Sequence, residues 1–142
     1  MKKLLLSGLF CVVALSDTKI PMEENKIYIL DFFASWCVSC EKEIPILSQI
    51  GEKLKKQNIE IIGIDVDKNP QDGKKFQQKL QKYFTFKVIN DSNNEIINSY
   101  KPLGMPALYI VKNDAICGKI FGAVQNLEER IDEQIKLCKE KK

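Results

Sequence analysis

Residues 32–45 read FFASWCVSCEKEIP. Cys37 and Cys40 are separated by two residues, Trp36 directly precedes the first cysteine, and Pro45 lies five residues after the second. Cysteine pairs at this spacing occur in redox couples, in halves of metal sites and in disulfides without chemistry. The other residues of the chain decide between these three kinds of pair.

The alternatives to a redox couple find little support. A structural zinc site usually needs four Cys or His ligands in two close pairs, and Cys117 and Cys138 are isolated. Covalent haem attachment needs a His where this chain has Glu41. An inert disulfide between Cys37 and Cys40 would close too small a loop to stabilise the fold much. We therefore expect a redox-active pair and no metal or other cofactor.

The composition predicts one ordinary folded domain. The chain has 142 residues, 44% of them hydrophobic and 29% charged, which suits a single core. Its net charge of +3 comes from interleaved acids and bases, so no basic patch for nucleic acid is indicated. There is no histidine, which excludes Ser-His-Asp and Cys-His catalysis and His-ligated metals.

Residues 1–16 differ in kind from the rest. Two lysines precede an apolar run over residues 4–15, which is the layout of a secretory signal and shorter than the ~20 residues that span a bilayer. We expect residues 1–16 to be a signal peptide or N-terminal membrane anchor and residues 17–142 to form the domain. The protein is then exported to the periplasm or cell envelope. Cleavage of the signal, or lipidation at Cys11, stays open.

The pattern of apolar residues predicts the order strand, helix, strand, helix, short helix, strand, strand, helix. Asn69 and Asn126 are expected to cap helices, the latter with Glu129 three residues on. The expected elements are strands at 27–33, 59–66, 107–111 and 116–121, helices at 40–57, from 70 and from 127, an extended piece at 86–89 and a helical turn at 96–100. This order favours a mixed sheet covered by helices on both faces.

The spacing of the cysteines gives them different expected roles. If residues 35–37 turn from the first strand into the first helix, Cys37 lies at a helix N-terminus, which stabilises a thiolate. Cys40 lies one turn further and deeper, as the thiol that resolves a mixed disulfide does. Asp31, within an apolar strand, is expected to be desolvated and to act as the base that deprotonates Cys40. Trp36 is expected to cover the disulfide and to help dock a substrate.

Two stretches carry a resemblance to a known family. Residues 31–40, DFFASWCVSC, followed by Pro45, resemble the active-site segment of the thioredoxin superfamily. Gly104-Met105-Pro106, just before a strand, is similar to the cis-proline loop of that superfamily. The resemblance covers about residues 26–138. It implies a thioredoxin fold of the α/β class, with the Met105 backbone free to pair with an extended substrate peptide beside Pro106.

Within the superfamily, Cys40-Glu41-Lys42-Glu43-Ile44-Pro45 is similar to the pattern of exported TlpA/ResA/DsbE-like proteins. This resemblance implies a monomeric thiol–disulfide oxidoreductase that reduces envelope proteins, with apocytochrome c as a candidate substrate. It also implies a membrane reductase of the DsbD/CcdA type as electron donor. The chain departs from the group at Asp31, where many relatives carry Asn, and at Asp67-Lys68, where several carry a catalytic glutamate.

Three alternatives stay open at this point. Two thiolates can hold Cu(I), so a metal carrier is the reading from another functional class, although such a carrier needs neither Trp36 nor Pro106. A relay domain like the C-terminal domain of DsbD shares the Trp-Cys-Val-Ser-Cys spelling, and an inactive adaptor would not need the cysteines. The redox direction, and whether Cys117 pairs with Cys138, are also open.

Overall fold

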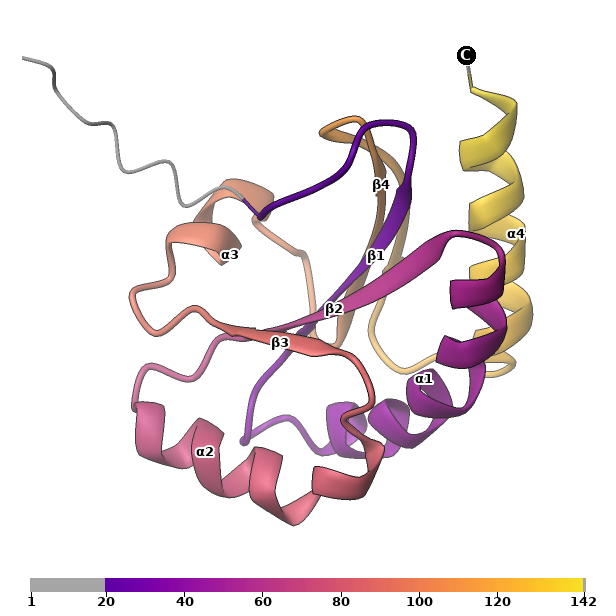
Figure 1. Cartoon of the computed structure of the whole chain (residues 1–142). Helices are drawn as coiled ribbons and strands as arrows, with labels where there is room; N and C mark the ends of the chain where they lie inside the picture. Colours follow the sequence, from indigo (N-terminus) through magenta and orange to yellow (C-terminus); the bar gives the residue numbers. More distant parts are fainter. Residues whose placement is uncertain (1–19, 142) are drawn as a thin grey trace, which may run out of the picture.

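The computed structural model describes residues 20–141, so the expected signal or anchor lies outside the described residues. A five-stranded sheet has the strand order β3-β2-β1-β4-β5 (Figure 1). The elements are β1 (Ile27–Phe33), α1 (Val38–Lys56), β2 (Ile59–Asp65), α2 (Pro70–Lys79), η1 (Gln81–Tyr83), β3 (Lys87–Asn90), α3 (Glu95–Tyr100), β4 (Ala107–Lys112), β5 (Ala115–Phe121) and α4 (Leu127–Glu140). Within this part of the chain, no helix is both long and apolar enough to cross a membrane.

β1 is the central strand, and all seven of its residues are buried. It pairs parallel with β2 and antiparallel with β4, while β3 and β5 form the two edges. Helices α1 and α4 lie on one face of the sheet and α3 on the other (Figure 1). This arrangement confirms the predicted mixed sheet and the thioredoxin fold.

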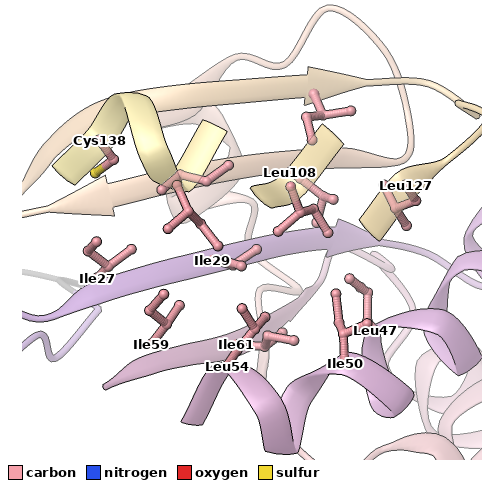
Figure 2. Packing of buried hydrophobic residues seen from close by; sticks show 14 residues of the cluster. Ile27, Ile29, Leu47, Ile50, Leu54, Ile59, Ile61, Leu108, Leu127 and Cys138 are labelled. Carbon is pink, nitrogen blue, oxygen red and sulfur yellow. The ribbon is translucent and has the colours of Figure 1, made fainter. Parts of the chain in front are cut away.

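The alternation of side chains along β1 divides the core into two layers. Ile27 and Ile29 point to the face that α1 and α4 cover, whereas Leu30 and Phe32 point to the face that α3 covers. Figure 2 shows the first layer, in which α1 and α4 contribute Leu47, Ile50, Leu54, Leu127 and Cys138 to a cluster with isoleucines of β1 and β2. Both helices therefore bury the apolar residues of one face against the sheet.

The two predicted asparagine caps have different outcomes. The Asn69 side chain accepts a hydrogen bond from the N–H of Gln71 at 3.0 Å, and Pro70 is the first residue of α2, as expected. Asn126 is the N-cap residue of α4, as predicted, but its side chain makes no capping hydrogen bond. Its backbone is left-handed (φ 55°), whereas a capping side chain normally accompanies an extended backbone.

A second disulfide joins β5 to α4 between Cys117 and Cys138. Ile110 pairs with Gly118 and Val111 pairs with Ile116, so Cys117 is the extra residue of a β-bulge. A bulge lets two successive side chains point to the same face, and both Cys117 and Gly118 face α4. The disulfide therefore fixes the C-terminal helix to an edge strand, at the end of the sheet remote from Cys37.

We expect this disulfide to stabilise the fold. Replacing both partners (Cys117→Ala, Cys138→Ala) should lower the free energy of unfolding by about 3 kcal/mol, because the bond closes a long loop and Cys138 is buried in the core. Urea denaturation measures the change. The double variant Cys37→Ala, Cys40→Ala is the control, since its bond spans a sequence separation of only 3. Equal losses in the two double variants would contradict the expectation.

Candidate active site

The cysteine pair sits where β1 turns into α1. The N–H of Cys37 donates to the carbonyl of Ala34 at 3.1 Å, which closes a tight turn. Cys37 is the N-cap of α1, and its Sγ accepts a hydrogen bond from the N–H of Cys40 at 3.2 Å. The two cysteines are joined as a disulfide. α1 begins at Val38, two residues earlier than predicted, so that Cys40 already lies inside the helix.

The disulfide is shielded from water, but the residues on either side of Cys37 are exposed apolar side chains. Cys37 is 6% exposed and Cys40 1%, so both cysteines are buried in this disulfide-bonded state. Trp36 and Val38 on either side of Cys37 are 65% and 70% exposed. Leu103, in the loop before β4, is 91% exposed. Apolar surface of this kind is typical of a site that docks another chain.

The predicted proline loop lies against the same pair. The peptide bond between Met105 and Pro106 is cis, and Met105 packs against the cluster that contains Cys37 and Cys40. The sequence comparison with the thioredoxin superfamily had indicated this geometry, and the structure has it.

Two carboxyl groups are buried beneath the cysteine helix. Asp31 points from β1 toward α1, and Glu43 lies on the buried side of α1, three residues after Cys40. Among the described residues, neither oxygen of Asp31 and not Oε1 of Glu43 has a hydrogen-bond partner. Burial raises the pKa of Asp31 to about 7. Burial, and then the charge of Asp31, raises the pKa of Glu43 to about 9. At neutral pH the two groups therefore hold at least one proton between them.

Glu43 also lies beside a cavity. The cavity has a volume of about 220 Å³ and is lined by Glu43 together with Ser39, Lys42, Ile46, Ala123, Val124 and Leu127. Glu43 lies within the motif of residues 40–45, but the sequence predicted no role for it. Its position on the apolar stripe of α1, three residues after Cys40 and four before Leu47, was the available signal.

Asp67 is the other polar residue whose role the sequence left uncertain. Its carboxylate accepts hydrogen bonds from the N–H and the hydroxyl of Ser35, at 2.9 and 2.7 Å. It therefore binds the turn before the cysteines. Among residues 20–141, no three Cys, His, Asp or Glu side chains gather in a way that would hold a metal ion.

A Cys-x-x-Cys disulfide at the start of a helix, on this sheet and beside a proline loop, defines a thioredoxin-like thiol–disulfide oxidoreductase. The chain belongs to the AhpC/TSA family, whose model matches residues 5–120. Helix α4 thus lies beyond the matched region.

Named relatives agree with this class. The chain is 29% identical over 131 residues to the thiol-disulfide oxidoreductase ResA of Bacillus thuringiensis subsp. konkukian, covering 89% of this chain and 73% of that protein. It is 31% identical over 129 residues to ResA of Bacillus anthracis, covering 89% and 68%. The chain is therefore a thiol–disulfide oxidoreductase, similar to ResA.

Solved structures confirm the fold. A Chlorobium tepidum protein described as a DsbE thiol:disulfide interchange protein superposes with a TM-score of 0.71 at 25% identity, covering 79% of each chain. StoA from Bacillus subtilis superposes with a TM-score of 0.67 at 20% identity, covering 80% of this chain and 84% of StoA.

The buried carboxyl pair predicts an unusual pH dependence of stability. Because the pKa of Asp31 is raised from 3.8 to about 7 in the folded protein, the stability associated with its protonated form is full below about pH 4. That stability is lost as the pH rises through 7. Asp31→Asn cannot ionise, so at pH 8 it should be about 2–4 kcal/mol more stable than the wild type, and no more stable at pH 4.

Urea denaturation of the oxidised proteins across this pH range measures the difference. Asp91→Asn is the control, because the Asp91 carboxylate is equally buried but accepts hydrogen bonds from Ile96 and Ile97. It should gain no stability at any pH. An Asp31→Asn gain that is independent of pH would contradict the assignment.

Proposed function

We propose that this protein is an exported reductant of disulfides in envelope proteins, with cytochrome c maturation as its setting. The observation that carries the proposal is the pair of partnerless carboxyl groups, Asp31 and Glu43, beneath a Cys37–Cys40 disulfide at a helix N-terminus. Such a pair is costly to bury and is suited to moving a proton near neutral pH.

The reaction runs in two exchanges. The Cys37 thiolate attacks one sulfur of a substrate disulfide, forms a mixed disulfide and releases the other substrate sulfur as a thiolate. Cys40 then gives its proton to the carboxylate of Asp31, with Glu43 sharing the charge, and attacks Cys37 Sγ. The second substrate sulfur leaves as a thiolate. The substrate has gained two electrons, and Cys37 and Cys40 are again a disulfide.

The charge beneath the pair supports the direction. Oxidants of this class hold their reduced form through a stabilised thiolate. Here the Asp31 carboxyl group, whose pKa is raised to about 7, becomes negatively charged as the pH rises through neutrality, while Glu43, with a pKa of about 9, keeps its proton. Val38-Ser39 between the cysteines supplies no cation. Negative charge beside a thiolate destabilises it and so favours the disulfide form of the protein, which is the property of a reductant.

We assign substrate contacts to the exposed apolar side chains near Cys37 and to the proline loop. Trp36 and Val38 supply apolar surface beside Cys37, and Leu103 in the loop before β4 is also exposed. The backbone of Met105 beside Pro106 would pair with an extended peptide. We propose protein thiols and disulfides as substrates, apocytochrome c among them. A membrane reductase of the DsbD/CcdA type would return Cys37 and Cys40 to thiols, and the protein would act as a monomer.

Two observations support export. Residues 1–16 have the pattern of a signal or anchor. The Cys117–Cys138 disulfide, buried away from the reactive pair, is of the kind that persists in oxidising compartments.

The trapping variant Cys40→Ala tests the proposal. In the native host it should accumulate covalent adducts that migrate as larger species on non-reducing gels, because the mixed disulfide can no longer be resolved. The adducts should vanish in Cys37→Ser, Cys40→Ala, and the trapped proteins identify the pathway. An absence of adducts, together with tight retention of Cu(I) by the unchanged protein, would support a metal carrier instead.

Trp36→Ala tests the docking surface. Because Trp36 is 65% exposed, the free energy of unfolding of the variant should lie within about 0.5 kcal/mol of the wild-type value. Its KM for a disulfide-bonded protein should rise about tenfold, as for loss of an exposed aromatic anchor. Steady-state reduction assays give both constants. An unchanged KM would remove Trp36 from the docking surface.

A further inference from the structure

The turn that carries Cys37 is hydrogen-bonded to a buried carboxylate, that of Asp67. β1 and β2 are parallel and finish side by side, at the pair Phe33 and Asp65. The N–H of Val66 donates to the carbonyl of Phe33 at 3.0 Å. Beyond this point one chain makes the turn at residues 34–37 and the other reaches Asp67. The Asp67 carboxylate accepts both hydrogen bonds that Ser35 donates to it.

Asp67 is itself held in place. Its N–H donates to Oδ1 of Asp65 at 3.0 Å, and Oδ2 of Asp65 accepts from Nε2 of Gln77 on α2 at 2.7 Å. The same Nε2 lies 3.0 Å from Oδ1 of Asn90 at the end of β3. α2 packs so closely here that a Cβ on Gly73 would overlap the Asp65 carboxylate. A continuous chain of hydrogen bonds thus joins the cysteine turn to α2 and β3.

The ends of this turn, Ala34 and Cys37, are buried in the core, but the middle of the turn is not. Its two central residues are Ser35, which is half-buried, and Trp36, whose side chain is mostly in solvent. Within the turn, the N–H of Cys37 binds the carbonyl of Ala34. The bonds from Ser35 to Asp67 connect the turn to the rest of the protein, and bonds to a carboxylate are stronger than bonds between neutral groups.

We propose that Asp67, acting through Ser35, is a positioning residue that keeps Cys37 at the N-cap of α1. The proposal rests on the proposed role of Cys37 as the attacking thiol. In that position the free N–H groups at the start of α1 can stabilise the sulfur as a thiolate. If the turn loosens, Sγ leaves these N–H groups and its reactivity at neutral pH falls.

The charge of Asp67 has the opposite effect on Cys37. A negative charge near a thiolate destabilises it, so a purely electrostatic role predicts that removing the charge makes Cys37 ionise at lower pH. Loss of positioning predicts ionisation at higher pH. A role in stability alone predicts no change in the reactivity of the folded protein. The three roles therefore differ in sign and can be separated.

The experiment follows alkylation of Cys37 by iodoacetamide between pH 5 and 10. The full chain carries Cys11→Ser and Cys40→Ala, so that Cys37 is the free thiol while Cys117 and Cys138 remain bonded. Ser35→Ala removes one hydrogen bond to Asp67 and keeps its charge. Asp67→Asn removes the charge and one acceptor oxygen, and Ser35→Thr keeps the hydroxyl.

For Ser35→Ala and Asp67→Asn we expect the alkylation profile to move to higher pH and the rate at pH 7 to fall roughly threefold to tenfold. Ser35→Thr should react like the parent protein. Asp91→Asn is the matched control, because it changes a buried carboxylate that accepts two backbone hydrogen bonds from α3 and none from Ser35. It should lose stability in urea and leave the profile unchanged.

A shift of Asp67→Asn to lower pH would overturn the proposal in favour of an electrostatic role. Profiles of Ser35→Ala and Asp67→Asn that match Asp91→Asn would overturn it in favour of a role in stability. Alkylation needs no disulfide substrate, so failure of the proposed function would be seen separately. It would appear as an unsubstituted protein whose Cys37 is alkylated normally but which reduces no protein disulfide.

Discussion

The parallel pairing of β1 with β2 is the interaction on which the site depends. Because the two strands end in register, the turn that carries Cys37 begins beside the residues that follow β2. β4 runs antiparallel to β1, with Ala107 opposite Phe32. Pro106, just before β4, therefore lies at the same end of β1 as the cysteine turn. One central strand therefore gathers three distant parts of the chain around a single disulfide.

The same strand carries a group that weakens the fold. Asp31 lies on the face of β1 that α1 covers, where the other side chains are the apolar Ile27, Ile29 and Phe33. Glu43 faces it from α1. Unpartnered carboxyl groups in such a layer oppose folding once they ionise. The isoleucine-rich layer and the disulfide between β5 and α4 offset that cost. Under the proposed function, the two groups take up the proton that Cys40 gives up.

Much of this architecture could be predicted from local patterns in the sequence. The apolar run of β1 matched the strand residue for residue, and the cap at Asn69 followed from the Asn-Pro pair. Other features depend on contacts that no local pattern reports. Cys117 reaches Cys138 because a bulge changes the direction of one side chain, and Asp67 meets Ser35 across two strands. The burial of Glu43 could have been predicted, because its spacing from Cys40 and Leu47 places it on the buried side of α1. The helical pattern was defined from apolar residues only, and so left Glu43 out.

The two disulfides place opposite demands on the surroundings of the protein. Cys37–Cys40 lies between the exposed apolar residues Trp36 and Val38, whereas Cys117–Cys138 has one sulfur in the core and lies at the far end of the sheet. Under the proposed function, the first bond must be opened in every cycle and the second must survive all of them. Newly made protein must therefore encounter an oxidant before it can serve as a reductant, and would itself be a client of the disulfide-forming machinery of its compartment.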